Sequence, residues 1–316
     1  MAKTTRRPQA ARKSAARPAT VARRGISVHV GLNAVNAQHY GGWNGMLVAA
    51  EADATAMGEL AAANGIKAEV LLGANATRAK VLTAIRAAAK TVGTSDLFVL
   101  SFAGCGGQIP DYSGHEADRL SETWCLYDAQ LLIDEVLIEL NRFVAGSRIV
   151  VVQDTGYSGT VTRAVPLPTD ERLATRMRFA PAAVVLGTYR EHQKFYDMLS
   201  KDVAKSRTRS ARTHAVPTRP SPRIRDVESD APAIIAISAA QDNQVATEGD
   251  RHGLFTSRLL ETWDGGRFKG NYTKLFQAVR AAMPPSQTPK LTPVSNATAF
   301  VRERPFLVDS GSAYDA

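Results

Sequence analysis

The chain has 316 residues, of which 44% are hydrophobic and 22% charged, with two cysteines and a formal net charge of +9. This composition excludes a globally disordered chain, and two cysteines exclude a disulfide scaffold or a cysteine-rich zinc site. No apolar run approaches the roughly 20 residues of a membrane helix, and no apolar segment follows the basic N-terminus, so we expect a cytoplasmic protein with no membrane partner.

The positive charge is concentrated in residues 1–24, which hold eight basic residues and no acidic one, so that residues 25–316 are near +1. A segment of this kind cannot bury enough apolar surface to order itself, and we predict a disordered basic tail. Two other interpretations stay open for the tail. It would bind nucleic acid or anionic surfaces without specificity, or it would be an organellar transit peptide.

Apolar, β-rich runs alternate with helical patterns through the first half of the chain. The predicted strands are 25–33, 67–73, 95–107 and 147–154, and the predicted helices are 46–64, 78–92 (capped by Thr77) and 131–143. Such alternation indicates βαβ units and a mainly parallel sheet. Functional residues lie at the carboxyl ends of the strands in such sheets. The loops after Asn33, at 103–108 and at 154–159 are therefore the candidates for a functional site.

The pattern breaks down after about residue 165. We predict an irregular insertion over residues 166–230, in which KFYDMLSKDVAKSR (194–207) is compatible with a helix. A disordered basic linker at 206–225, rich in Arg, Ser, Thr and Pro, follows. Order resumes with a strand ending in a polar turn (231–244), helices over 252–263 and 271–283, and a last strand over 296–308.

Seven segments occur in one order at one spacing: FAGCGGQIPD, ETWCLYD, LLIDEVL, RIVVVQDTGYSGTVTR, SAAQDNQVA, GLFTSRLLETW and SQTPK. Together they resemble the metacaspase/orthocaspase branch of caspase-like cysteine proteases, bacterial type, over residues 26–306. The resemblance implies an α/β caspase-like fold, with a six-stranded, mostly parallel sheet flanked by helices. A large (p20-like) half would span 25–165 and a small (p10-like) half 231–316, in a monomer. The family cleaves after Arg or Lys, commonly with calcium activation.

Both members of the family's His–Cys dyad are replaced. The family's Ser-Gly-His-Gly-Gly loop matches residues 103–107, so Cys105 stands at the histidine position. Its Asp-Ser-Cys-His-Ser-Gly turn matches residues 154–159, so Gly156 stands at the cysteine position. Losing a nucleophile together with its base costs on the order of 10⁶ in rate. His115 is the best stand-in for the base, but we expect it to be a solvated loop residue. The other histidines show no ligand spacing, and no zinc site is predicted.

Acids expected in the pocket for a basic side chain are retained. Asp154 matches one of them, Asp53 a second, and Asp242 fits a third element that lines the cleft. Buried carboxylates of this kind hold a guanidinium through paired hydrogen bonds. The alternative is that Asp53 is a solvated helix residue and Asp154 caps a loop.

The family's calcium site is eroded. Its paired aspartates appear here as Ile133-Asp134, Asp118 matches a further ligand, and Arg163 stands where another acid is expected. Calcium takes six or more oxygen ligands. We therefore predict weak or absent calcium binding and no other cofactor.

The sequence favours a caspase-like pseudoprotease with a binding or regulatory role. Its ligand would be a basic peptide or protein, or an active caspase-like relative. The alternative is a cysteine endopeptidase cleaving after Arg or Lys, with residual activity through Cys105, or an inactivated variant of an active metacaspase. Departures from the family at Thr155, Tyr157 and Ser121 weigh against engineered inactivation. A nucleic-acid-associated protein acting through residues 1–24 is a third class. Without a dyad, we expect no self-cleavage.

Overall fold

A central sheet of six strands organises the computed structural model, which describes residues 23–111, 119–156, 177–213 (207–213 by their backbone alone), 231–241 and 244–308. The strand order is β2-β1-β3-β7-β8-β9, and every pairing is parallel except that of β9 with β8. The strands are β1 (Gly25–Gly31), β2 (Lys67–Leu72), β3 (Leu97–Ala103), β7 (Arg148–Asp154), β8 (Ala233–Ser238) and β9 (Lys290–Ser295).

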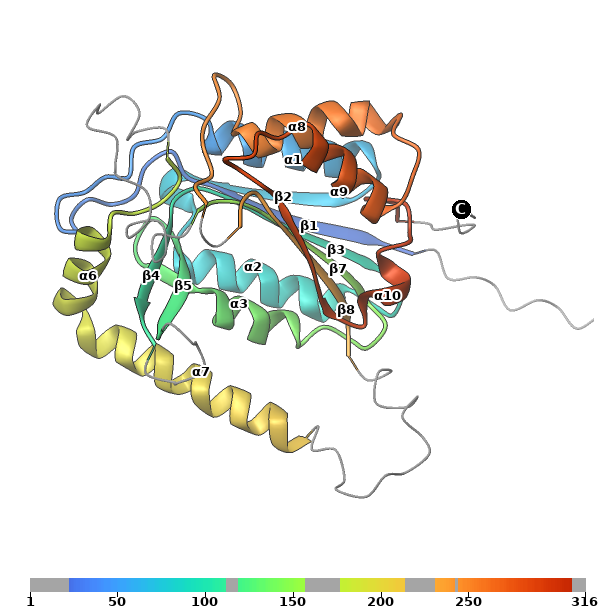
Figure 1. The fold of residues 1–316 in the computed structure, drawn as a ribbon. Coiled ribbons are helices and arrows are strands. Elements are labelled where there is room, and N and C mark those ends of the chain that lie inside the picture. Colours follow the sequence, from blue (N-terminus) through green and yellow to red (C-terminus); the bar gives the residue numbers. More distant parts are fainter. Residues whose placement is uncertain (1–22, 112–118, 157–176, 214–230, 242–243, 309–316) are drawn as a thin grey trace, which may run out of the picture.

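A second, antiparallel sheet has the order β4-β5-β6 and stands beside the first (Figure 1). Its strands are β4 (Gly106–Pro110), β5 (Leu120–Cys125) and β6 (Gln130–Leu132). The first of them begins three residues after β3 ends, so the chain passes from the central sheet into the small sheet through Gly104 and Cys105.

Helices cover both faces of the central sheet. In Figure 1, α1, α8 and α9 lie on one side of it and α2 and α3 on the other, with α6 and α7 beyond the small sheet. The helices are α1 (Ala50–Ala63), α2 (Arg78–Thr91), α3 (Ile133–Leu140), α6 (Ala182–Glu191), α7 (Gln193–Thr213), α8 (Leu254–Trp263), α9 (Tyr272–Ala281) and α10 (Ala297–Phe300). The Thr77 side chain accepts a hydrogen bond from the Lys80 amide and caps α2, as predicted.

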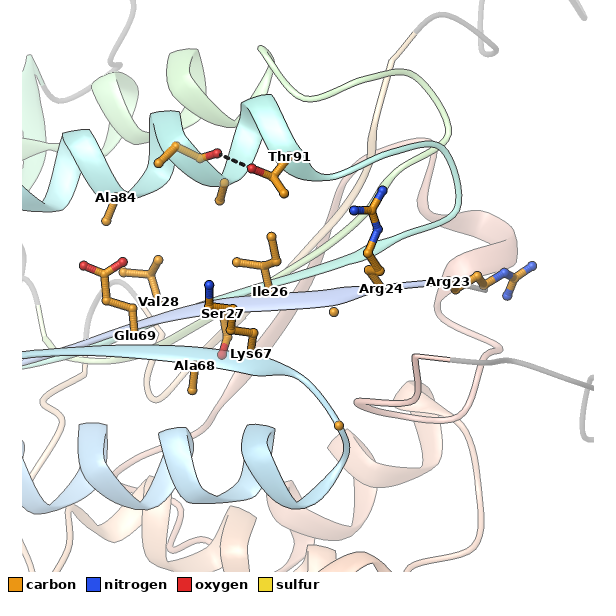
Figure 2. Close-up of a pocket in the computed structure, with 14 residues that line it drawn as sticks. Arg23, Arg24, Ile26, Ser27, Val28, Lys67, Ala68, Glu69, Ala84 and Thr91 are labelled. Atoms are coloured by element: carbon orange, nitrogen blue, oxygen red, sulfur yellow. Dashed lines mark hydrogen bonds between the residues drawn. The ribbon is translucent and has the colours of Figure 1, made fainter. Parts of the chain in front are cut away.

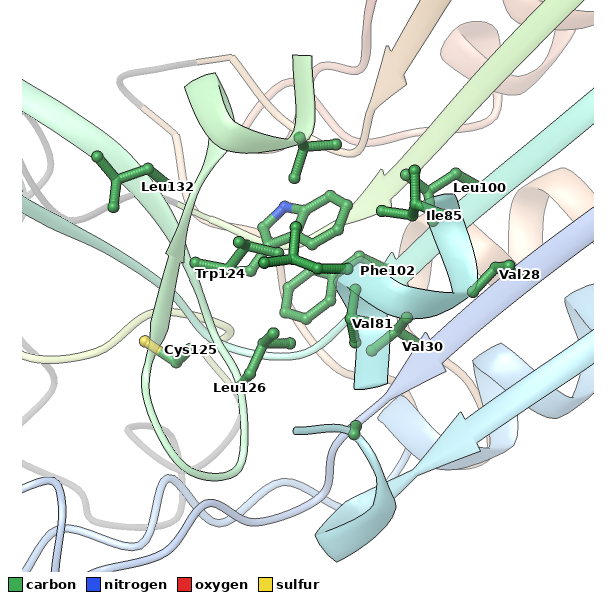
Figure 3. Packing of buried hydrophobic residues seen from close by; sticks show 14 of the residues in the cluster. Val28, Val30, Val81, Ile85, Leu100, Phe102, Trp124, Cys125, Leu126 and Leu132 are labelled. Carbon is green, nitrogen blue, oxygen red and sulfur yellow. The ribbon is translucent and has the colours of Figure 1, made fainter. Parts of the chain in front are cut away.

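Two buried clusters hold these layers together. One joins the sheet to α2, α3 and the small sheet, and Figure 3 shows the stacked rings of Phe102 and Trp124 at its centre, with centroids 4.5 Å apart. The other joins the opposite face to α1, α8 and α9. Every residue of β3 and β7 is buried, because both strands lie inside the sheet and are covered on both faces.

The structure confirms the mostly parallel sheet flanked by helices and corrects three element predictions. The segment predicted as one helix over 131–143 is divided into β6 and α3. The last strand is β9 rather than 296–308, where Asn296 turns the backbone at φ 44° into α10. An edge strand tolerates the Pro293 that makes β9 look unlike a strand in the sequence.

The third correction concerns the insertion predicted to be irregular over 166–230, apart from the helix compatible with 194–207, which α7 contains. Its described part carries α6 and α7, and α7 extends to Thr213, well into the predicted linker. Pro181 stands at the start of α6, where proline is tolerated, and no proline follows before Pro217. Among the helices of the described ranges, none has the length and apolarity needed to cross a membrane.

Candidate functional site

The carboxyl ends of β3 and β7 lie side by side and bring the two predicted dyad positions together. Ala103 pairs with Asp154 at the last register position of the two strands. Cys105 and Gly156 each follow two residues later, and the Gly104 amide donates to the Asp154 carbonyl at 3.4 Å. The site therefore stands at the edge of the sheet where the sequence predicts it.

Cys105 is a buried, neutral thiol. Its side chain is 3% exposed, and Sγ donates a hydrogen bond to the Gly45 carbonyl at 3.8 Å. Burial, with a smaller contribution from Glu248 and against the effect of Arg178, raises the pKa of Cys105 to about 12. Only the thiolate is a nucleophile, so at neutral pH this sulfur is in its unreactive form.

Gly156 presents a backbone amide, without a side chain, to the cleft. Its N–H donates to the Arg178 carbonyl at 2.9 Å. A Cβ placed on Gly156 would lie 3.2 Å from the Ala246 nitrogen and 3.5 Å from the Arg178 oxygen. The first distance is tight and the second is ordinary contact, so the space over Gly156 is occupied by the neighbouring chain segments.

Three acids surround one buried guanidinium at the carboxyl ends of the strands. Arg178 Nη2 lies 2.6 Å from Asp53 Oδ2 and 3.3 Å from Glu248 Oε1, and Arg178 Nη1 lies 3.2 Å from Asp154 Oδ2. The side chain of Arg178 is 0% exposed and those of the three acids are at most 2% exposed. The Arg178 Nη1 also donates to the Asp154 carbonyl at 3.1 Å.

The acids are themselves held in place by α8 and the turn before it. Asp53 accepts from the Gly253 amide at 3.0 and 3.1 Å, and it lies 2.9 Å from His252 Nδ1. Asp154 Oδ2 accepts from the amide and the hydroxyl of Thr256, at 3.1 and 2.6 Å.

Glu248 is held by backbone amides that precede α1. Its two carboxylate oxygens accept the amides of Val48 and Ala49, just before α1, at 2.7 and 2.9 Å. Since each acid is oriented by contacts other than Arg178, the three form a rigid negative pocket.

Three carboxylates beside one guanidinium leave excess negative charge. The pKa of Asp53 is raised in this environment. Burial, assisted by Asp154 and opposed by Arg178, raises the pKa of Asp53 from 3.8 to about 6. Burial alone would lower the pKa of Arg178, but Asp154, Asp53 and Glu248 raise it overall. Arg178 is therefore a permanent cation at this place.

Gly253 allows the backbone to close on the pocket. A Cβ at this position would lie 2.4 Å from Asp154 Oδ2 and 2.7 Å from Arg178 Cζ. Real Cβ atoms do not approach so closely, so only glycine fits beside Asp154 and the guanidinium without displacing them.

Comparison with known proteins identifies the fold family. The model of the caspase domain (Peptidase C14) matches residues 34–301. The chain belongs to the caspase-domain family. A search of curated proteins gave no match.

Two solved structures resemble this caspase domain. Protein GSU0716 from Geobacter sulfurreducens is 39% identical, with a TM-score of 0.76, covering 90% of this chain and 99% of its own. Caspase-1 from Spodoptera frugiperda is 11% identical, with a TM-score of 0.52, covering 92% of this chain and 95% of its own. The second likeness concerns the fold alone, which is the α/β caspase-like fold that the sequence motifs imply.

The predicted pocket acids have different outcomes in the caspase domain. Asp53 and Asp154 are buried together and face the same cation, so Asp53 is not a solvated helix residue. Asp154 also accepts the Thr256 amide in the first turn of α8, so it does take part in capping. Asp242 lies outside the described residues, as do His115 and Arg163.

Sequence reasoning missed Glu248, His252 and Arg178. Glu248 stands in a polar stretch that has no periodic pattern, and His252 is the first residue of the predicted helix 252–263. The available signal for Arg178 was an arginine between the apolar residues Met177 and Phe179, three residues before Pro181.

The described residues do not by themselves fit a calcium ion. Asp134 is half-buried in the first turn of α3, and Asp118 lies outside the described residues. Within the described ranges, no three His, Cys, Asp or Glu side chains gather as a metal site. Weak or absent calcium binding stays a prediction.

Away from the acidic pocket, a cavity of about 510 Å³ lies between β1, β2 and α2 (Figure 2). Figure 2 shows Arg23 and Arg24 at one end of it and Glu69 at the other. Its lining contains none of the three pocket acids, so it is not part of the site at the strand ends.

Proposed function

We propose that this caspase-domain protein is a pseudoprotease of the metacaspase/orthocaspase type, which binds an arginine side chain in its cleft and does not cut the peptide. Its ligand is a basic peptide or protein segment, including one presented by an active caspase-like relative. The observation that carries the proposal is the guanidinium of Arg178 held by Asp53, Asp154 and Glu248 at 2.6 to 3.3 Å.

The pocket favours arginine over lysine. The two terminal nitrogens of Arg178 reach different acids, and Nη1 also reaches the Asp154 carbonyl. A planar guanidinium satisfies these separated acceptors at once, whereas an ammonium is a single point charge on a narrower stem. A lysine would leave part of this buried acceptor set unpaired, which is costly in a dry site.

Catalysis is disfavoured by the state of the two dyad positions. Gly156 offers no nucleophilic atom, and the thiol of Cys105, just after β3, is neutral and hydrogen-bonded to the Gly45 carbonyl. An endopeptidase acting through Cys105 would need a thiolate with a pKa near neutrality, several units below about 12.

A peptidase assay tests the absence of catalysis. We expect no turnover of fluorogenic peptides with arginine or lysine before the reporter, with or without calcium, in the wild type and in Cys105→Ala alike. The loss relative to an intact dyad is on the order of 10⁶. Turnover that disappears in Cys105→Ala would refute the pseudoprotease.

A further inference from the structure

Residues 177–180 cross the cleft as an extended segment between two parts of the caspase domain. Met177 forms an antiparallel bridge with Thr247, and Phe179 forms a parallel bridge with Gly106. The Arg178 amide donates to the Ala246 carbonyl at 2.9 Å, and the Ala180 amide donates to the Gly106 carbonyl at 2.7 Å. The segment is therefore bound on both sides, as a peptide is when it adds a strand to an open edge.

The carbonyl oxygen of Arg178 faces two backbone N–H groups. It accepts from the Gly106 amide at 3.1 Å and from the Gly156 amide at 2.9 Å, and Thr155 Oγ1 adds a longer bond at 3.4 Å. Two convergent amides at this distance are the arrangement that stabilises the oxyanion in acyl transfer. One of them belongs to Gly156, the position that would carry the nucleophile.

The guanidinium of Arg178 lies in the acidic pocket, so both the side chain and the carbonyl group of this residue are bound. The side chain is paired with Asp53, Asp154 and Glu248, and the carbonyl is polarised by two amides. A Cβ on Gly156 would stand 3.5 Å from the Arg178 oxygen. The peptide bond between Arg178 and Phe179 is thus presented to position 156 as the bond to be cut would be presented to a nucleophile.

We infer that residues 177–180 are an internal pseudosubstrate: Arg178 occupies the arginine pocket of its own chain, and the cleft is closed to any ligand from outside while it stays there. This regulation rests on the function proposed above. A tethered ligand competes at a high effective concentration, and the apparent affinity for an external peptide falls with the fraction of open molecules. A partner must displace this segment to reach the acids.

Binding of a labelled peptide tests the inference. The probe is fluorescein-labelled Met-Arg-Phe-Ala-Pro-Ala, the sequence of residues 177–182, followed by fluorescence anisotropy. In Arg178→Glu a fourth carboxylate cannot stay among the three acids, so the segment leaves and the pocket residues are unchanged. The exposed Arg267, paired with Asp264 at the surface, gives the charge-matched control Arg267→Glu.

We expect Arg178→Glu to bind the probe at least about tenfold more tightly than the wild type and Arg267→Glu. Binding should be lost with an alanine in place of the probe's arginine, and in Arg178→Glu combined with Asp53→Asn. Equal binding by wild type and Arg178→Glu would overturn the internal pseudosubstrate and leave the arginine pocket standing. No binding by a folded Arg178→Glu would overturn the pocket itself.

A second variant covers the case in which Arg178→Glu does not fold. Arg178→Ala empties the pocket without adding charge, and agmatine supplies the missing guanidinium. We expect agmatine to raise the melting temperature of Arg178→Ala and not that of the wild type or of Arg148→Ala, which removes a buried arginine at the opposite end of β7. An equal shift in all three proteins, or no shift in Arg178→Ala, would overturn the inference.

Discussion

At the scale of single residues, the burial of Asp53 makes the stability of the protein depend on pH. The pKa of Asp53 is raised to about 6 in the folded state from 3.8. Between these values the folded protein holds a proton that the unfolded chain has lost, so the contribution of Asp53 to the free energy of unfolding falls as the pH rises.

Urea titrations at pH 4, 5, 6 and 7 measure this contribution when the wild type is compared with Asp53→Asn, which cannot ionise. We expect the free energy of unfolding of the wild type, minus that of Asp53→Asn, to decrease as the pH rises through this range. A difference that is constant, or that increases with pH, would show that Asp53 is not a buried carboxyl with a raised pKa.

Gly253 is a second residue that the pocket constrains, because the surrounding side chains leave no space for a Cβ. Gly253→Ala places a Cβ 2.4 Å from Asp154 Oδ2 and 2.7 Å from Arg178 Cζ, so Asp154 or Arg178 must move. We expect a loss of unfolding free energy of about 2 kcal/mol or more, the scale of overpacking in a buried site. Gly187→Ala in α6 is the matched control, because its Cβ meets nothing within 4 Å. It should be neutral or stabilising by about 0.5–1 kcal/mol. Equal losses in both variants would contradict the close approach.

At the scale of elements, the segment 177–180 is anchored by one side chain. Arg178→Ala removes that anchor, and the hydrogen bonds of the segment to Gly106, Gly156 and Ala246 should open together. We expect the amides of residues 106, 156, 178 and 180 to exchange with deuterium at least about tenfold faster than in the wild type, while the amide of Val99 inside β3 is unchanged. Unchanged exchange of all four would mean that the backbone contacts hold the segment without Arg178.

The elements also show what the sequence can and cannot predict. Strands β1, β3 and β7 were predictable because their short runs, rich in apolar and β-branched residues, match burial on both faces of the sheet. Strand β9 was missed because Pro293 is compatible only with an edge, and edge position is a property of the whole sheet.

For the site, the family resemblance pointed to Asp53, Asp154, Cys105 and Gly156, since each stands at a position of a family motif. Arg178 had no such context. Its contacts reach 125 residues along the chain to Asp53 and 70 residues to Glu248. Only the tertiary structure shows that one arginine of a segment without periodicity fills the pocket.

At the scale of the whole molecule, the caspase domain has one of its own arginines, Arg178, bound in its acidic pocket. Elements far apart in the chain contribute to the same pocket: Asp53 and Asp154 come from α1 and β7, and Glu248 comes from the segment between β8 and α8. Arg178 pairs with all three acids. Its segment therefore ties these elements together, so displacing it should affect binding and stability jointly.

Restoring the dyad tests this account most directly. In Gly156→Cys combined with Cys105→His, the thiolate would attack the Arg178 carbonyl carbon and the imidazolium would protonate the departing nitrogen of Phe179. Water would then hydrolyse the thioester to leave the Arg178 carboxylate and a free thiol. Intact mass spectrometry should show fragments 1–178 and 179–316 for the double variant and an uncut wild type. A double variant that turns over an arginyl peptide but leaves the bond between Arg178 and Phe179 intact would contradict the account.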